Sequence, residues 1–168
     1  MRFELLKVLL VDDNHHMRSI LAEVMRAIGV RDIYEASDGA EALTSLKSRP
    51  VDIVMTDLSM TPLDGIDLTR LIRNSEDSTC PMIPIIMITG HTTQRRVGEA
   101  RDAGVTEFLA KPVTAFGVIQ RINRVVNKPR AFIRAPDYFG PDRRRSIDTA
   151  WSGPRRRSED AKSQPLDA

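Results

Sequence analysis

Acidic side chains follow two of the short apolar runs in this sequence. Asp12 and Asp13 come directly after the run 7–11, and Asp57 comes directly after the run 51–56. Carboxylates that crowd together repel one another unless a cation lies among them. Mg²⁺ is a hard cation that prefers oxygen ligands. If the two runs lie side by side in the fold, the sequence predicts a magnesium-binding pocket.

Phosphoryl transfer is the chemistry that such a pocket favours. A carboxylate beside Mg²⁺ can attack phosphorus, because the ion and a nearby ammonium group neutralise charge on the phosphoryl oxygens. Thr89 and Lys111 follow two later apolar runs. We expect Asp57 to be the nucleophile, Lys111 to supply the ammonium, and Thr89 to donate its hydroxyl to the phosphoryl group. Each acid taken alone is better explained as a helix cap, but capping does not explain the whole set of polar residues at successive strand ends.

Short apolar runs alternate with segments of helical periodicity, which is typical of a parallel sheet covered by helices. The sequence predicts strands at 7–11, 32–36, 51–56, 83–88 and 107–110, and helices near 15–28, 39–48, 65–74, 93–103 and 114–127. In an open parallel sheet the functional crevice lies beyond the carboxyl ends of the strands. The polar residues named above therefore fall where a site is expected.

Composition and cysteine content indicate a cytoplasmic protein. The longest apolar stretch, near 82–88, is too short to cross a bilayer, so we expect no membrane insertion. The single cysteine, Cys80, cannot form an internal disulfide, which fits a reducing compartment. The formal net charge of +2 conceals an asymmetry, because arginines concentrate after residue 127.

The character of the chain changes at residue 128. Prolines recur and apolar residues lose their periodicity, so we expect a domain at 1–127 and an extended, mostly disordered tail at 128–168. A Gly-Pro-x-Arg-Arg-Arg unit nearly repeats on either side of Trp151. Guanidinium groups pair with phosphate and with the O6/N7 edge of guanine, and aromatic rings stack on bases. The tail therefore predicts a ligand that combines phosphates with flat bases.

Four motifs in order, VLLVDDN, DIVMTDLSMTPLDG, IIMITGH and EFLAKPV, resemble the receiver domain of CheY-like two-component response regulators. The resemblance covers residues 5–127. It implies an α/β flavodoxin-like (βα)5 fold with strand order 2-1-3-4-5, and phosphorylation of Asp57 by a histidine kinase or phosphotransfer protein. Such a protein is a signalling switch rather than an enzyme.

The same resemblance implies roles for individual residues. Thr89 and Phe108 match the switch positions, and the Lys111–Pro112 bond is expected to be cis. The resemblance also implies that the carboxylates of Asp13 and Asp57 bind Mg²⁺, that Asp12 acts on the ion largely through water, and that the main-chain carbonyl of Ser59 completes the shell.

The tail resembles the arginine-rich extension of the Cle group of CheY-like proteins. That resemblance implies that it binds cyclic di-GMP and that the protein acts at the flagellar motor switch complex. The candidate ligand contacts are the arginines, aromatic residues and acids of the tail: Arg130, Arg134, Tyr138, Asp142, Arg143, Arg144, Arg145, Asp148, Trp151, Arg155, Arg156 and Arg157.

Three other interpretations remain open at this point. The tail could be a solvated basic segment, which would leave a plain single-domain regulator or a phosphate sink. It could instead bind the phosphate backbone of nucleic acid, although no helix-turn-helix segment accompanies it. A magnesium-dependent phosphohydrolase is disfavoured, because Ser59 occupies the place where such enzymes carry a second acid.

Overall fold

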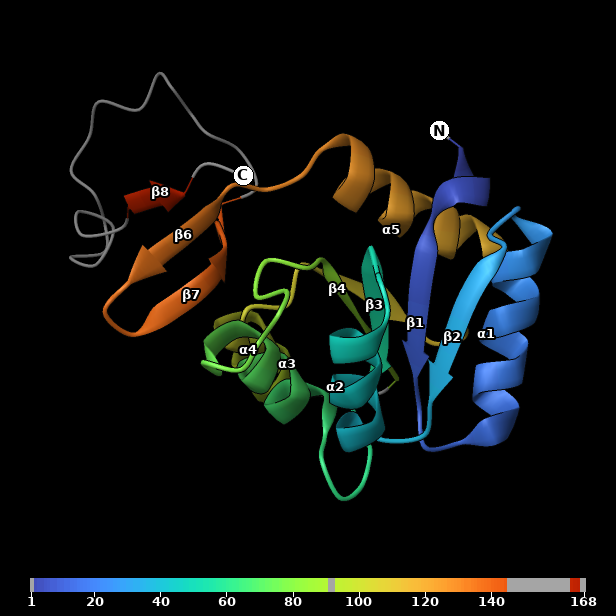
Figure 1. Ribbon diagram of the computed structural model, residues 1–168, viewed down its shortest axis with the longest axis horizontal. Coiled ribbons are helices and arrows are strands. Elements are labelled where there is room, and N and C mark those ends of the chain that lie inside the picture. The colour runs from blue at the N-terminus through green and yellow to red at the C-terminus, as the bar shows by residue number, and fades with distance from the viewer. Residues whose placement is uncertain (1, 91–92, 145–163, 167–168) are drawn as a thin grey trace.

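Five parallel strands form the central sheet of this computed structural model, in the order β2-β1-β3-β4-β5 (Figure 1). The structure describes residues 2–90, 93–144 and, as backbone, 164–166. The five strands are β1 (Lys7–Val11), β2 (Asp32–Ala36), β3 (Ile53–Asp57), β4 (Ile85–Thr89) and β5 (Glu107–Ala110). The order is the one that the family resemblance implied, and it places β1 and β3 side by side.

Helices follow the strands in regular alternation. They are α1 (His15–Ala27), α2 (Gly39–Ser48), α3 (Gly65–Asn74), α4 (Gln94–Ala103) and α5 (Ala115–Asn127), after a short N-terminal 3-10 turn, η1 (Phe3–Leu5). Each α-helix begins after a residue whose side chain accepts a hydrogen bond from a backbone N–H of the first turn, which satisfies an otherwise unpaired donor. These capping residues are Asn14, Asp38, Asp64, Thr93 and Thr114.

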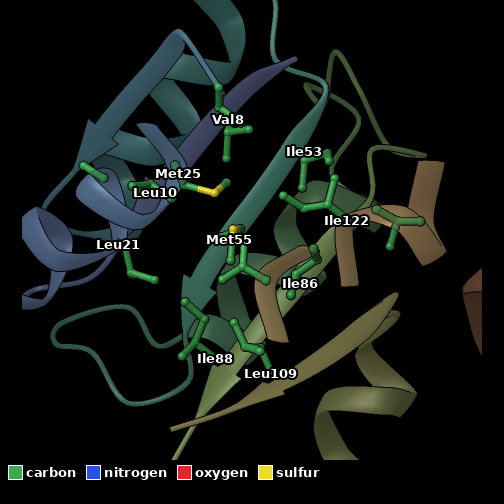
Figure 2. Close-up of a cluster of buried hydrophobic side chains, with 14 residues drawn as sticks. Val8, Leu10, Leu21, Met25, Ile53, Met55, Ile86, Ile88, Leu109 and Ile122 are labelled. Atoms are coloured by element: carbon green, nitrogen blue, oxygen red, sulfur yellow. The ribbon is translucent and has the colours of Figure 1, made fainter. Parts of the chain in front are cut away.

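The two faces of the sheet carry separate apolar clusters. On one face, α1 and α5 pack against alternate residues of β1, β3 and β4, and Figure 2 shows Leu10, Met55 and Ile86 in the centre of this cluster. On the other face, α2, α3 and α4 cover the intervening residues. Because both faces are covered, β3 and β4 are buried along their whole length.

Predicted and observed boundaries differ by at most two residues. The predicted strand 83–88 begins at Ile85 because Pro84 has no N–H to donate to a neighbouring strand. The predicted strand 51–56 similarly begins at Ile53 and ends at Asp57. The Lys111–Pro112 bond is cis, as expected, and Thr61–Pro62 is cis as well.

The segment after α5 departs from the prediction of an extended, mostly disordered tail. Strands β6 (Phe132–Ala135) and β7 (Tyr138–Pro141) form an antiparallel hairpin, and β8 (Gln164–Leu166) pairs with the other edge of β6. The rings of Phe132 and Phe139 lie 5.8 Å apart and both are buried. The run of prolines suggested disorder, but Pro136 occupies the turn and Pro141 ends the hairpin, where neither breaks the strand pairing.

The hairpin packs against α3 and α4 and lies well away from α1 and α2 (Figure 1). Gly104, between α4 and β5, lies against Phe139 and Gly140 of β7, where an added Cβ on Gly104 would be 3.0 Å from the Phe139 oxygen. The hairpin therefore lies at the amino edge of the sheet. Within the described part of the chain, no helix has the length and apolar character needed to cross a bilayer.

Candidate functional site: an acidic pocket at the carboxyl edge of the sheet

Asp12, Asp57 and Lys111 converge from three different strand ends. Asp57 is the last residue of β3, and Asp12 and Lys111 directly follow β1 and β5. The Nζ atom of Lys111 lies 2.8 Å from Asp57 Oδ1 and 3.9 Å from Asp12 Oδ2. Both carboxylates are buried, at 2% exposure for Asp12 and 6% for Asp57. The ammonium group is therefore shared between two carboxylates at the edge where the sequence predicted a pocket.

Backbone donors fix the orientation of the two carboxylates. The amide of Asn14 donates to Asp12 Oδ1 at 2.8 Å, and the amide of Ser59 donates to Asp57 Oδ2 at 3.0 Å. Arg18 Nη1 donates to the main-chain oxygen of Asp12 at 2.6 Å, which ties α1 to the end of β1. Each carboxylate thus has one oxygen held by the backbone and the other directed toward Lys111.

The environment of Asp12 favours an added cation. Its Oδ2 atom is buried and accepts no hydrogen bond from the described residues. Burial raises the pKa of Asp12 above its ordinary value, and the charges of Asp57 and Asp13 raise it further, although the Asn14 amide and Lys111 oppose this. A divalent ion beside Asp12 would favour the charged form of this carboxylate and relieve the repulsion among the acids.

Mg²⁺ fits this set of oxygen donors. Among the described residues, no group of three or more His, Cys, Asp or Glu side chains has the mutual arrangement of an all-protein metal centre. Asp13 is exposed, and its Oδ2 accepts a hydrogen bond from the Thr61 amide at 3.3 Å. Mg²⁺ usually takes only one or two carboxylates and keeps several waters, in contrast to metals held in closed cages. A cluster in which Asp12 and Asp57 are buried and Asp13 is exposed to solvent suits that ion.

Thr89 and Phe108 lie on the neighbouring strands β4 and β5. Thr89 is the last residue of β4, and its main-chain oxygen accepts a hydrogen bond from the Lys111 amide at 2.8 Å. Phe108 is half-buried and packs against the cluster formed by α3, α4 and the end of β3. Thr89 is therefore connected directly to the lysine of the pocket. The switching role of either residue stays a prediction.

Several tail residues that were expected to contact a ligand pair within the protein. Arg130 Nη2 lies 2.8 Å from Glu107 Oε1, and Glu107 is only 2% exposed. Arg144 Nη2 lies 3.0 Å from Asp142 Oδ2. The hydrogen bonds from Arg144 contribute to lowering the pKa of Asp142, although burial acts in the opposite direction.

The aromatic residues of the hairpin carry guanidinium groups on their faces. The guanidinium carbon of Arg134 lies 4.5 Å from the ring centre of Phe139, and that of Arg143 lies 4.0 Å from the ring centre of Tyr138. Arg143 Nη1 also lies 3.4 Å from Asp102 Oδ1 on α4. The remaining candidate contacts lie outside the described residues: Arg145, Asp148, Trp151, Arg155, Arg156 and Arg157.

Sequence reasoning missed the residues of the receiver that hold the hairpin. Arg73, in the last turn of α3, is 3% exposed and lies over the ring of Phe132 at 5.0 Å. Its Nε donates to the Gly104 oxygen at 3.1 Å, and burial lowers its pKa to about 10. One signal was available, because two β-prone runs flank Pro136–Asp137, a pair typical of turns. No sequence pattern connects Arg73 or Glu107 to that hairpin.

Comparison with known proteins supports the interpretation of the pocket. The family described as "Response regulator receiver domain" matches residues 8–123. The chain is 35% identical over 123 residues to chemotaxis protein CheY-3 of Vibrio cholerae, a match that covers 73% of this chain and 93% of the relative. It is 34% identical to chemotaxis protein CheY of Pseudomonas aeruginosa, covering 73% of this chain and 98% of the relative.

A solved structure gives the same result for the fold. The receiver domain of a sensor histidine kinase from Pseudomonas aeruginosa, with a magnesium ion coordinated in its active site cleft, is 28% identical with a TM-score of 0.65. The similarity covers 73% of this chain and 98% of that one. Together with the acidic pocket and the strand order, these matches show that the chain belongs to the response regulator receiver domain family.

Proposed function

We propose that this protein is a CheY-like signalling switch that accepts a phosphoryl group on Asp57 and binds cyclic di-GMP through its arginine-rich C-terminal segment. The observation that carries the first half is the contact of Lys111 Nζ with Asp57 Oδ1 at 2.8 Å, next to the buried Asp12. An ammonium and a nucleophilic carboxylate in contact are what phosphoryl transfer to an aspartate requires.

The proposed reaction needs only groups that the pocket and a donor supply. A carboxylate oxygen of Asp57 forms a bond to phosphorus while the P–N bond to a donor histidine breaks, and the electron pair returns to the imidazole. Lys111 pairs with the transferring phosphoryl group, and the hydroxyl of Thr89 donates to it after transfer. Asp12, Asp13, Asp57 and the Ser59 carbonyl would hold Mg²⁺, which would supply positive charge to the phosphoryl oxygens.

Membership of the family supports a proposal for the donor and for the target. Histidine kinases or phosphotransfer proteins carry the phosphohistidine that reacts with a receiver aspartate. Two of the similar proteins are chemotaxis proteins by name, which supports a role in motility. We propose the flagellar motor switch complex as the target, with Thr89 and Phe108 transmitting the phosphorylated state to the surface of α4, β5 and α5.

Incorporation of phosphate tests the first half. With acetyl phosphate and Mg²⁺, the full chain is expected to take up one phosphoryl group, and Asp57→Asn is expected to take up none. Asp52→Asn is the matched control, because Asp52 is exposed and pairs with the Lys7 amide at the other end of the sheet. Equal incorporation by wild type and Asp57→Asn would refute the assignment of the nucleophile.

The hairpin supports the second half of the proposal. Arg134 of the hairpin and Arg143 just after it lie over the rings of Phe139 and Tyr138, with guanidinium carbons 4.5 Å and 4.0 Å from the ring centres. Such surfaces accept a stacked purine, while the free edges of the guanidinium groups pair with phosphate oxygens. The same hairpin leads directly into the segment that holds Arg145, Trp151 and the second arginine triplet.

Calorimetry with defined nucleotides tests the second half. Cyclic di-GMP is expected to bind the full chain at micromolar concentration, and Arg143→Ala is expected to weaken binding at least tenfold. GMP and a single-stranded DNA oligonucleotide serve as comparisons. Binding of DNA with a steep dependence on salt, and indifference to nucleotide identity, would favour a nucleic-acid-binding regulator instead. If no nucleotide produces heat on titration, the second half of the proposal is refuted, and the protein is a plain regulator or phosphate sink with an inert tail.

A further inference from the structure

Helices α3 and α4 both begin beside the acidic pocket. The Gly65 amide at the start of α3 donates to the Leu58 oxygen at 3.1 Å, one residue after Asp57. Four residues of chain separate Thr89 from the first residue of α4. At these amino ends the helices are tied together, because Arg96 Nη2 lies 2.7 Å from Asp64 Oδ2.

The carboxyl ends of the same two helices hold the tail hairpin. Arg73 of α3 donates to Gly104 after α4 and lies over the Phe132 ring of β6. Asp102 of α4 pairs with Arg143, which follows β7. At Gly104 the hairpin approaches so closely that an added Cβ would lie 3.0 Å from the Phe139 oxygen.

The pocket and the hairpin are therefore joined by one pair of packed helices. Each helix has ten residues and is about 15 Å long. Along this length the cluster of Ile66, Met87 and Ala100 fills the space between the helices and the sheet. A phosphoryl group or ion that restrains the amino ends of α3 and α4 also restrains their carboxyl ends, because close-packed helices move as units.

We infer that α3 and α4 couple the two sites, so that a phosphoryl group on Asp57 strengthens the binding of an anionic dinucleotide at the β6–β7 hairpin. This inference rests on the proposed function. A charged group and a metal ion in the pocket restrain Asp57 and the adjoining starts of both helices. The hairpin then packs on a pair of helices that has already lost part of its conformational freedom, so fixing the hairpin around its ligand costs less conformational entropy. Coupling is reciprocal, so the dinucleotide also favours the phosphorylated state.

Calorimetry of the full chain measures the coupling. Cyclic di-GMP is titrated in Mg²⁺ with and without beryllofluoride, which forms a stable phosphoryl mimic on aspartate. The dissociation constant is expected to fall by at least about fivefold when beryllofluoride is present, which is the lower end of typical couplings between sites. An unchanged or a higher dissociation constant would overturn the inference.

Arg96→Gln is the variant that separates coupling from binding. The substitution breaks the tie between the helices, but Asp64 still caps α3, because its Oδ1 accepts from the Ile66 and Asp67 amides. Arg95→Gln is the matched control, since Arg95 is 87% exposed and pairs only with Glu99 on its own helix among the described residues. We expect Arg96→Gln to bind cyclic di-GMP but to lose most of the effect of beryllofluoride, and Arg95→Gln to keep it.

Hydrogen exchange distinguishes a failure of this inference from a failure of the proposed function. The Asp142 amide donates to the Ala131 oxygen at 2.7 Å, within the hairpin itself, so its exchange reports opening of the hairpin, which packing on α3 and α4 opposes, and it does so without any nucleotide. Beryllofluoride is expected to slow exchange in the hairpin of wild type and of Arg95→Gln but not of Arg96→Gln. If cyclic di-GMP does not bind, slowed exchange still supports coupling between pocket and hairpin, whereas unchanged exchange in wild type overturns it.

Discussion

At the scale of single residues, Lys111 balances the charge of the pocket. Its ammonium is 2.8 Å from Asp57 and 3.9 Å from Asp12, but Asp12 Oδ2 accepts no hydrogen bond from the described residues. A buried carboxylate oxygen without a donor is costly, and this cost falls when a cation binds. Mg²⁺ is therefore expected to stabilise the charged form of Asp12 more than that of the other acids of the pocket.

Removal of Asp12 should weaken the response of the protein to Mg²⁺. At ten times its dissociation constant, Mg²⁺ is expected to stabilise the wild-type protein by about 1.4 kcal/mol. Asp12→Asn should lose most of this gain, whereas the exposed Asp32→Asn should retain it. Thermal unfolding in Mg²⁺ and in EDTA measures the difference. An undiminished shift in Asp12→Asn would show that the ion binds elsewhere.

Arg130 presents a second residue-scale test, because its guanidinium neutralises a buried acid. Loss of either Arg130 or Glu107 leaves an incompletely compensated charge, although Arg124 Nη1 remains 3.5 Å from Glu107 Oε2. Arg130→Met is expected to lower the free energy of unfolding by about 3 kcal/mol, while the double change Arg130→Met with Glu107→Leu should be close to neutral. Urea denaturation of the single and double variants checks this.

The same pair decides between anchoring and direct ligand contact. If Arg130 only anchors the hairpin, Glu107→Gln should weaken cyclic di-GMP binding about as much as Arg130→Met does. Retention of full affinity by Glu107→Gln, together with a loss in Arg130→Met, would instead place Arg130 in contact with the nucleotide.

At the scale of elements, the hairpin depends on a glycine. Gly104 and Gly29 both have positive φ angles, of 105° and 101°, so alanine strains the backbone equally at either position. The two positions differ in the room available for a side chain. An added Cβ at Gly29 would lie 3.7 Å from its nearest non-adjacent neighbour, whereas one at Gly104 would lie 3.0 Å from the Phe139 oxygen. Gly104→Ala should therefore cost the strain of about 1 kcal/mol plus roughly another 1 kcal/mol for displacing the hairpin.

Unfolding and hydrogen exchange of the two alanine variants separate these contributions. Gly104→Ala should speed exchange of the Asp142 amide, and Gly29→Ala should leave it unchanged. Equal exchange in both variants would contradict the close docking of the hairpin at Gly104.

The predictability of the elements follows from how local their signals are. Strands such as 7–11 are short, continuous apolar runs that can be recognised without knowledge of their neighbours, so their ends were predicted to within two residues. The hairpin was missed because each of its strands has only four residues and depends on distant partners. Its stability comes from Arg73 and Gly104, which lie far away in the sequence and carry no local sign of that role.

At the scale of the whole molecule, the receiver and the hairpin pack as one body. The predicted boundary at residue 127 leaves out three residues that contact the receiver: Phe132 lies under Arg73, the Phe139 oxygen lies close to Gly104, and Arg130 pairs with Glu107. A chain ending at 127 exposes Arg73 and leaves Glu107 with only Arg124 among its described partners. It is expected to be about 3 kcal/mol less stable than a chain ending at 144, since burial of one large apolar side chain contributes roughly 1.5–3 kcal/mol. Chemical denaturation of both chains decides this, and equal stability would show that the hairpin is a dispensable appendage.

The pocket was the part of the site that could be predicted from the sequence. Parallel strands bring their carboxyl ends to one edge, so Asp12, Asp57 and Lys111 had to lie close together once the strand order was known. The partners of the tail arginines could not be predicted in this way. Arg130 and Arg143 pair with acids on β5 and α4, and such pairing depends on the packing of the hairpin rather than on any spacing.

The position of the phosphoryl group tests the central claim most directly. The full chain is treated with acetyl phosphate in Mg²⁺, the acyl phosphate is reduced with borohydride, and the modified peptide is sequenced by mass spectrometry. Reduction converts a phosphorylated aspartate to homoserine, so the account predicts homoserine at position 57, dependent on Mg²⁺ and absent without the phosphodonor. Homoserine at another acid, or none at all under conditions in which a known receiver domain is modified, would contradict it.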